Sequence, residues 1–402
     1  MISKQNRLLW VLALGHGATH WHRGAMSVCL PLILKDLSMN YTQMGLIRSV
    51  QQIVAMISTM VGGLATDILN QRKAILVFSV LWPSLFFSFQ GYATTFLVFG
   101  ALVWAQMLFG GYLWHSPARA VIGETFPDRM GYGLGVHGMG GNLAQALAPL
   151  AIGGLLLFIG WRTAFKLHLI PGLLVALLLW QLLPSLGRSM EERKKGTSYV
   201  AGFRTEILGN IPFLGITLVG ALRSVGENVI PTFLPLYLYY EMKMSPPTIG
   251  VYLASLAMVG AIAAPIVGHL SDRWGRKPIV FLCLLSGSML ITAIPWVHST
   301  AILFPMISLG GVVLFSVGPV IQASGLDHTP QELWGSAQSF MDIGRSTLSL
   351  IFPLVAGAVA DLYGLSYTFY LFGGITLIAA LVMLSVPQRT QGRGHRKDEI
   401  SK

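Results

Sequence analysis

The sequence predicts an all-α integral membrane protein whose twelve transmembrane helices form two pseudo-symmetric bundles of six. The first observation is composition: 53% of the 402 residues are hydrophobic, only 11% are charged and the mean hydropathy is +0.64, whereas about 25% of a soluble domain is charged. The second is a series of apolar stretches, each near the roughly 20 residues that cross a bilayer. The third is an internal repeat at a nearly constant offset. Together they argue against a soluble enzyme.

The apolar stretches define the expected spans and domain boundaries. We expect an N-terminal six-helix bundle in 1–184, a cytoplasmic linker in 185–206, a C-terminal six-helix bundle in 207–387 and a basic cytoplasmic tail in 388–402. The polar start, 1–7, is too short for a cleavable signal peptide, so the apolar stretch after it is expected to remain as a helix. The expected spans are 8–34, 43–68, 74–92, 95–118, 132–158, 163–183, 208–238, 247–270, 278–297, 301–324, 336–360 and 366–386.

The net charge of +11 is distributed unevenly between the loops. Basic residues gather in alternate loops, which predicts a bacterial inner-membrane protein with both termini in the cytoplasm. The same distribution argues against nucleic-acid binding. The expected cytoplasmic set is Lys4, Arg7, Arg72, Lys73, Arg119, Arg129, Arg188, Arg193, Lys194, Lys195, Arg204, Arg273, Arg276, Lys277, Arg389, Arg393, Arg396, Lys397 and Lys402. The other loops hold only Lys35, Arg162, Lys166 and Lys243.

The two halves of the chain repeat each other. Pro31 recurs as Pro235, and Pro149 recurs as Pro353, each 204 positions later. A shared offset indicates a duplicated six-helix unit, with the substrate site expected between the halves at mid-membrane. The other landmarks are Leu30 and Leu32 (Leu234 and Leu236), Gly63 and Asp67 (Gly268 and Asp272, offset 205), Leu150 (Leu354), and Gly160 with Phe165 (Gly364 with Phe369).

The loop after the eighth expected span reads Gly268-His-Leu-Ser-Asp272-Arg273-Trp-Gly275-Arg276-Lys277. This loop resembles the motif of the major facilitator superfamily, and a degenerate version lies in the first half. Carboxylates at these helix ends can accept bonds from basic side chains or helix N-termini. We therefore expect Asp67 and Asp272 to latch the halves together on the cytoplasmic face, with solvated loop charges as the alternative. The expected gating residues are Gly63, Asp67, Arg72, Gly268, Asp272, Arg273, Gly275, Arg276 and Lys277.

Other segments refine the resemblance. Gly160-Trp161-Arg162-Thr-Ala-Phe165 is similar to the superfamily's loop before the sixth helix, whereas its fourth-span arginine motif is absent, with Gln106 at that place. Within the superfamily, the first half is most similar to the fosmidomycin-resistance-type exporters, which implies transport of a phosphonate-like anion. That family usually has Asn-Asp where this chain has Thr19-His20. The similarity rests on His16, Pro31, Gln43, Gly45, Gln52, Gly63, Asp67, Trp114, His115, the run 126–131, His137, Gly140, Gly141, Asn142 and Pro149.

Charged residues inside the apolar spans are functional candidates, because each costs roughly 2.5–3.5 kcal/mol at the bilayer centre. His16, His20, Arg23 and Ser27 share one helical face, and His115 and His137 are either cavity residues or structural histidines. Arg223 with Glu227 and Asp342 with Arg345 can each pair within one helix. Alternatively, Glu227 pairs with Arg23, its repeat counterpart. Arg48 either faces the cavity or snorkels outward. The expected cavity residues are His16, His20, Arg23, Arg48, His115, His137, Arg223, Glu227, Asp342 and Arg345.

The embedded charges also indicate the substrate. Four arginines against two carboxylates leave a positive surplus, which an anionic substrate would neutralise. Protons are the expected coupling ion, because embedded acids and histidines can bind them. We expect efflux of a small anionic organic compound or drug. The alternatives are proton-coupled import of an organic acid or phosphorylated metabolite and, more remotely, a membrane sensor or membrane-embedded enzyme.

No catalytic residue, cofactor or metal is expected, and the chain is expected to work as a monomer. Cys29 and Cys283 lie far apart in apolar spans and are expected to be buried thiols. His16 and His20 lie four residues apart and could share a metal, but no carboxylate or thiol lies near them in sequence, and Arg23 would repel a cation.

Overall fold

The computed structural model describes residues 4–68, 71–184, 207–330 and 333–387, and this part of the chain is helical without strands. The first half contains α1 (Lys4–Asp36), α2 (Tyr41–Ile68), α3 (Arg72–Gln90), α4 (Phe96–Leu108), α5 (Gly111–Thr125), the 3-10 turn η1 (Pro127–Arg129), α6 (Met130–Leu155), α7 (Trp161–Leu167) and α8 (Leu169–Leu182). The second half contains α10 (Ile211–Tyr240), α11 (Pro246–Trp274), α12 (Arg276–Ala293), the 3-10 turn η4 (Ile294–Trp296), α13 (Thr300–Gly311), the π-helical turn η5 (Val312–Ser316), α14 (Val317–Asp327), α15 (Trp334–Tyr363) and α16 (Leu365–Ser385).

These helices make twelve spans, because α4 continues into α5, α7 into α8, and α13 through η5 into α14. The expected span 95–118 instead runs from Phe96 to Thr125 with an interruption at Phe109 and Gly110. Glycine pairs weaken a helix at such points. The interruption η5 follows Gly311, where a Cβ would lie 1.9 Å from the Leu256 carbonyl oxygen of α11. The backbones of α11 and this span are therefore pressed together at the π turn.

Ten of the spans are apolar enough to be recognised by hydropathy, and the two exceptions are α1 and α6. α1 carries histidines and Arg23, and α6 is rich in glycine. These two helices pack closely against each other: a Cβ at Gly140 would lie 2.1 Å from the Ala13 carbonyl oxygen. The polar helix is thereby held inside the bundle by a helix whose small residues allow close approach.

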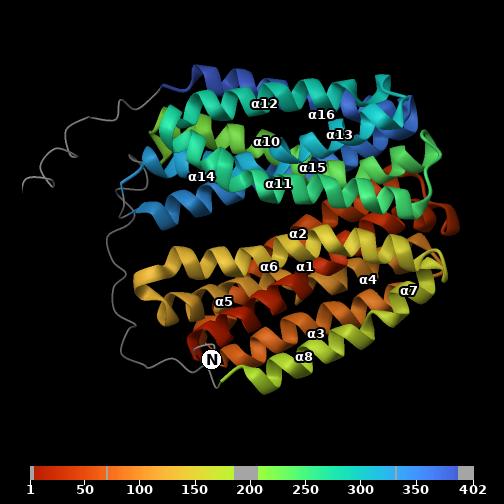
Figure 1. The fold of residues 1–402 in the computed structure, drawn as a ribbon, viewed down its shortest axis with the longest axis horizontal. Coiled ribbons are helices and arrows are strands. Elements are labelled where there is room, and N and C mark those ends of the chain that lie inside the picture. Colours follow the sequence, from red (N-terminus) through yellow and green to blue (C-terminus); the bar gives the residue numbers. More distant parts are fainter. Residues whose placement is uncertain (1–3, 69–70, 185–206, 331–332, 388–402) are drawn as a thin grey trace, which may run out of the picture.

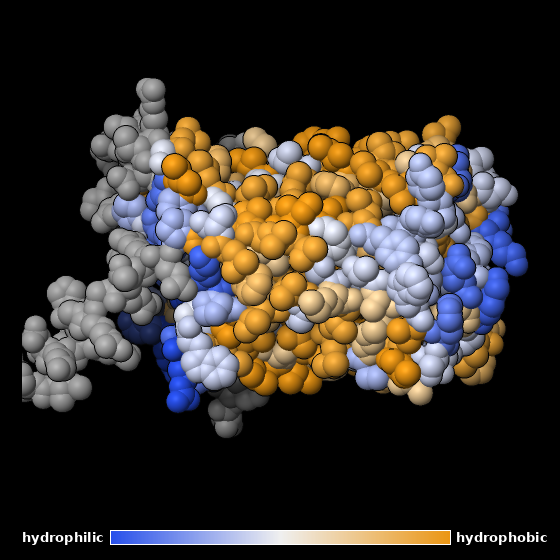
Figure 2. Space-filling model, turned by 90° about the horizontal axis from the view of Figure 1, so that it is seen from above, coloured by the Kyte–Doolittle hydropathy of each residue, from blue (hydrophilic) through white to orange (hydrophobic). Residues whose placement is uncertain are grey.

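The two halves form two layers, seen in Figure 1 as the red-to-yellow and the green-to-blue helices. We call the side on which α1 begins and α16 ends the terminal side, and the other the sealed side. α2 packs on α15 and α6 packs on α11, so that two seams join the layers. In Figure 2, orange apolar side chains fill the middle of the visible face and polar ones gather toward its two ends, as a bilayer requires.

The seams close the sealed side by backbone contact. A Cβ at Gly45 of α2 would lie 2.2 Å from the Pro353 carbonyl oxygen, and one at Gly250 of α11 would lie 2.4 Å from the Pro149 carbonyl oxygen. Gly45 and Gly250 are 205 positions apart, and Pro149 and Pro353 are 204 apart. The internal repeat therefore builds the same glycine–carbonyl seam twice.

One seam carries an additional staple. Asp361 of α15 accepts hydrogen bonds from the Tyr41 N–H at 3.0 Å, the Thr42 N–H at 2.8 Å and the Thr42 hydroxyl at 2.6 Å. It thereby caps the first turn of α2, where a carboxylate is stabilised by unpaired amides. The repeat counterpart of Asp361 in the other seam is Leu157, which has no such group. Asp361 is not among the residues for which the sequence predicts a role.

On the terminal side, strong ion pairs lie within each half. Arg72 binds Glu124 at 2.6 and 2.9 Å in the first half, and Arg276 binds Asp327 in the second. Arg72 and Arg276 are 204 positions apart, so these pairs also follow the repeat. The layers separate toward this side in Figure 1, and the cavity described below opens there.

The staple generates a prediction. Asp361→Asn removes charge-assisted bonds between α15 and α2, each worth about 1.5–3 kcal/mol, so the sealed side should open more often. Double electron–electron resonance between spin labels at Ser38 and Tyr367, both exposed on that side, should show a longer and broader distance distribution. The labels are placed in a Cys29→Ser, Cys283→Ser background.

Glu241→Gln is the matched control, because Glu241 is an exposed carboxylate on the same side and takes no part in either seam's contacts described above. An Asp361→Asn distribution identical to that of the control would contradict the role assigned to the staple.

Candidate functional site

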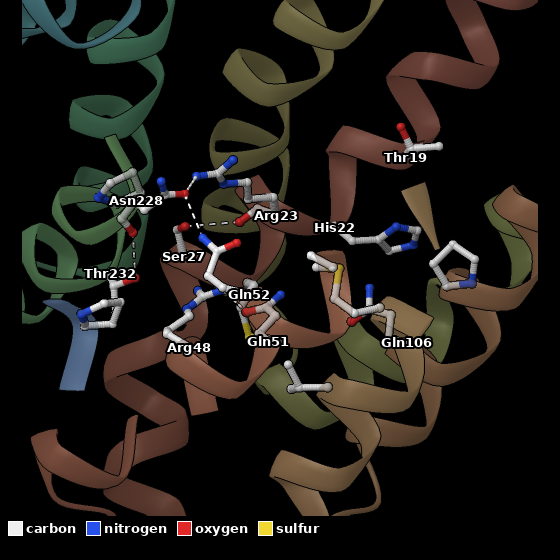
Figure 3. A pocket seen from close by; sticks show the side chains of 17 residues that line it. Thr19, His22, Arg23, Ser27, Arg48, Gln51, Gln52, Gln106, Asn228 and Thr232 are labelled. Atoms are coloured by element: carbon white, nitrogen blue, oxygen red, sulfur yellow. Dashed lines mark hydrogen bonds between the residues drawn. The ribbon is translucent and has the colours of Figure 1, made fainter. Parts of the chain in front are cut away.

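Two cavities meet at Arg23 in the middle of the molecule. The inner pocket lies between helices of the first half, α10 and Pro353 of α15. The entrance cavity lies between the halves and reaches the terminal side past Arg119, Asn142 and Pro319, which are exposed. Figure 3 shows the polar lining of the inner pocket, which is Thr19, His22, Arg23, Ser27, Arg48, Gln51, Gln52, Gln106, Asn228 and Thr232.

Arg23 of α1 reaches across to α10. Its guanidinium donates to the Glu227 carbonyl oxygen at 3.4 Å and to the Asn228 side-chain oxygen at 3.3 Å. Gln52 of α2 donates to the same Asn228 oxygen at 3.2 Å, and Figure 3 shows this group at the top of the pocket. Arg23 therefore lies beside Glu227, its counterpart in the repeat, but it binds the backbone carbonyl oxygen of Glu227 and not the side-chain carboxylate.

The Glu227 carboxylate is held by the second half. Arg223 binds it at 2.9 Å from the preceding turn of α10, and Arg345 of α15 approaches the same oxygen to 3.5 Å. Arg223 is buried and also donates to the Leu314 carbonyl oxygen. The within-helix pairing expected for Arg223 and Glu227 therefore forms, and Arg345 joins it. This cluster carries two positive charges against one negative.

Asp342 stands apart from this cluster. Its side chain is 56% exposed, lies 3.5 Å from Arg345 and lines neither cavity. Of the two embedded acids, only Glu227 faces the space between the halves.

Arg48 lines the inner pocket. Its guanidinium donates to the Gln51 side-chain oxygen at 3.0 Å, and it forms no ion pair with any residue that the structure describes. Its Nε–H is buried and has no partner. Arg48 does not snorkel outward but faces the pocket, opposite Arg23 in Figure 3. With no acid in its lining, the inner pocket is cationic.

The four expected histidines lie together beside the entrance cavity. The His16 ring centroid is 4.6 Å from that of His20, 5.1 Å from that of His115 and 4.1 Å from that of His137. His20 lines the entrance cavity and approaches the Gln145 side-chain oxygen to 3.4 Å. One nitrogen each of His16, His115 and His137 lies within 4.8 Å of the others, close enough to be brought onto one metal ion.

The loop motif makes its contacts inside the second half. Arg276 binds Asp272 at 2.9 Å and Asp327, and Lys277 donates to the Leu384 and Val386 carbonyl oxygens at 2.6 and 2.8 Å. Gly275 has φ +94°, a conformation that favours glycine at the end of α11. Arg273 is exposed and Gly268 has open space around it. All these contacts lie within the second half, and the terminal side is open. A latch formed by this motif between the two halves therefore stays a prediction.

The first-half version of this motif is described only in part. Arg72 is buried against Glu124. Gly63 and Asp67 belong to α2, but their side chains lie outside the described residues. Their gating role also stays a prediction.

Several lining residues were not among those expected from the sequence. Gln51, Asn228 and Thr232 are neutral, and neutral polar residues within apolar spans carry a weak signal. Arg119 was assigned to a basic loop but lies inside α5, where it lines the entrance cavity. Arg119 lies one residue beyond the expected span end, 118, so a longer expected helix would have included it.

The chain is 27% identical over 388 residues to the hexuronate transporter of Bacillus subtilis, covering 90% of each chain. It is 31% identical over 203 residues to multidrug resistance protein 2 of the same organism, covering 48% of this chain and 47% of that one. Among solved structures it is similar to a bacterial homologue of the human lysosomal transporter Spinster in an inward-facing, occupied conformation. That comparison has a TM-score of 0.82 at 17% identity, covering 96% of this chain and 97% of that chain.

The family assignment covers nearly the whole chain. Residues 12–220 and 213–401 each match the pattern of the Major Facilitator Superfamily. These proteins are transporters and not enzymes, in agreement with two repeated bundles around a polar central cavity. This chain is a member of the Major Facilitator Superfamily.

Proposed function

We propose that this transporter carries a small organic anion, whose acidic group binds between Arg48 and Arg23 in the inner pocket. The observation that carries the proposal is that neither arginine forms an ion pair with a described residue, although both line a pocket without acids. A desolvated guanidinium without a counter-ion is costly, and its planar donors suit carboxylate, phosphonate or phosphate. Substrate binding would supply the missing negative charge.

The remaining lining favours a hydroxylated anion. Gln51, Gln52, Asn228 and Thr232 bring amide and hydroxyl groups to the same pocket as the two arginines. Such groups both donate and accept, as recognition of substrate hydroxyls requires. A relative matched over 90% of its length is a hexuronate transporter, and a hexuronate is a sugar that bears a carboxylate. We therefore favour a hydroxy acid or sugar acid.

For energy we propose coupling to protons through Glu227. It is the one acid lining either cavity in the described part of the chain, and its carboxylate is shared between Arg223 and Arg345. Arg23 lines both the inner pocket and the cavity that holds Glu227, so an anion that drew Arg23 toward the inner pocket would leave less positive charge beside Glu227 and make its protonation easier. Substrate and proton would then bind together, as a symporter requires.

We further propose that the terminal side is cytoplasmic, because Arg72, Arg119, Arg129 and Arg276 lie toward it. The protein would reside in a bacterial inner membrane with both termini in the cytoplasm. The described conformation would then be open to the cytoplasm. Since all the groups invoked here come from one chain, a monomer is sufficient.

Efflux of an anionic antimicrobial is the second candidate. It is favoured by the multidrug resistance relative at 31% identity, although that match covers 48% of this chain. The fold and pocket are the same for either direction. Flux measured in inside-out against right-side-out vesicles separates uptake from efflux.

The pocket assignment predicts that Arg48→Gln weakens anion binding by about 10- to 100-fold, because a charge-assisted contact is worth about 1.5–3 kcal/mol. Binding of a panel of sugar acids and hydroxy acids to the purified protein would be measured by isothermal titration calorimetry and by counterflow in proteoliposomes. Arg129→Gln, which removes an exposed arginine outside both cavities, is the control. Unchanged affinity in Arg48→Gln, or preference for lipophilic cations, would refute the anion site.

The coupling assignment predicts that Glu227→Gln abolishes acceleration of flux by a pH gradient while counterflow exchange continues. The substitution should also lower stability by about 1–3 kcal/mol, because buried Arg223 loses its charged partner. Asp342→Asn is the control, since its carboxylate is more than half exposed and weakly paired. Gradient-driven flux that persists in Glu227→Gln would place the coupling proton elsewhere.

A further inference from the structure

A cluster of histidines beside the entrance cavity is not used by the transport proposal. His16 comes from α1, His115 from α5 and His137 from α6, so three separate helices bring one imidazole each to the same place. One nitrogen of each ring lies within 4.8 Å of the other two. We propose that His16, His115 and His137 form a binding site for a borderline divalent transition metal of the Zn²⁺ or Co²⁺ type.

The hydrogen bond of His16 fixes its tautomer. Its Nδ1 lies 2.8 Å from the His137 carbonyl oxygen, which can only accept, so Nδ1 carries the proton. In the neutral ring, Nε2 then presents a bare lone pair, and it is buried without a partner. A ring nitrogen bonded to a backbone carbonyl, with its opposite nitrogen free to coordinate, is the usual arrangement of a metal-binding histidine.

His137 supplies the second buried donor. Its side chain is 4% exposed, and neither ring nitrogen has a partner at hydrogen-bonding distance and angle. The Leu12 carbonyl lies near this ring but outside that geometry. Rotation of the ring about its last torsion therefore breaks no strong hydrogen bond. Leaving both nitrogens unpaired is costly for a buried group, and a metal would satisfy one of them.

Another buried histidine of the same half shows the contrasting arrangement. His168 donates from Nδ1 to the Ala164 carbonyl oxygen at 2.6 Å and accepts at Nε2 from the Trp21 indole at 3.1 Å. Both of its nitrogens are occupied, as expected of a histidine with a purely structural role. Single nitrogens of His22 and His328 are also buried without a partner, so what distinguishes His16 and His137 is that their rings converge with that of His115.

The spacing fits a metal after a small adjustment. Nitrogens in a tetrahedral zinc site lie about 3.4 Å apart, given bonds of about 2.0–2.1 Å, against the 4.8 Å limit observed. Ring rotation can close this difference of roughly 1.4 Å. Gly141 makes room for the rotation, since a Cβ there would lie 2.7 Å from the His16 ring. His20 lies beside this cluster, with its ring centroid 4.6 Å from that of His16.

The nearby charges limit the affinity. Arg119, one turn after His115, and Arg23 both line the adjoining entrance cavity and repel a dication. Arg119 is exposed, so water screens its charge. Three imidazoles without a carboxylate or thiolate suit Zn²⁺, Co²⁺ or Ni²⁺ and disfavour Ca²⁺ and Mg²⁺, which prefer oxygen ligands.

The test uses the full-length protein purified in detergent through a tag without histidines. Zn²⁺ or Co²⁺ is titrated alone, with no organic anion present, so the outcome does not depend on the proposed substrate. We expect one equivalent to bind, X-ray absorption to show at least three nitrogen neighbours at about 2.0–2.1 Å, and the thermal midpoint to rise. His16→Gln and His137→Gln should each reduce affinity by at least about tenfold.

Matched variants separate the site from other histidines. His168→Gln removes a buried but fully bonded imidazole, and His269→Gln removes an exposed one; both should retain the wild-type metal affinity. The proposal is overturned if no stoichiometric binding occurs, or if binding survives the combined His16→Gln, His137→Gln variant. It is also overturned if the thermal midpoint responds to pH but not to metal, which would make the cluster a proton site.

Discussion

The constraint on which this structure depends is that a charge placed inside the bilayer has to find its partner within the protein. Glu227 meets it through Arg223 and Arg345, and these three side chains tie α10 to α15 at the centre of the molecule. Arg23 meets it through oxygen atoms of α10. Because Arg48 and Arg23 have no described carboxylate, the central cavity keeps an excess of positive charge, and this excess determines which ligands it can hold. Because its charged and polar side chains also need partners within the protein, the polar helix α1 lies in the interior.

Close backbone approach makes that interior possible. α1 lies against the glycine-rich α6, while the two halves meet through the α2–α15 and α6–α11 seams at Gly45 and Gly250. Helices in lipid gain little from burying apolar side chains against each other, so small residues that bring backbones together supply the contact. The polar cavity and the tight seams are thus two parts of one arrangement: polar side chains face the centre where the halves part, and glycines lie where they touch.

Much of this could be predicted from the sequence, because hydropathy and the repeat act over whole helices. They identify the twelve spans, and embedded charges within those spans predict Arg23, Arg48 and Glu227 as cavity residues. Side-chain partners depend on the rotation of each helix and on contacts between distant segments. The repeat therefore places Arg23 beside position 227 without showing that it binds the backbone oxygen. The meeting of His16 with histidines of α5 and α6 is equally invisible to a pattern along one helix. Asp361 resembles an ordinary loop carboxylate until α2 is placed beside it.

The hydrogen bonds to Asp361 make the two seams of the duplicated molecule unequal in strength. Both seams share the glycine–carbonyl contact, but only the α2–α15 seam adds hydrogen bonds to a negatively charged group. Leu157, at the corresponding place near α6, cannot supply them. When the two halves separate on the sealed side, the α6–α11 seam has fewer contacts to lose and should open first. The α2–α15 seam would then remain closed and serve as the hinge. Two halves that repeat each other in sequence are thus joined by seams of unequal strength, and the α2–α15 seam is expected to act as the hinge.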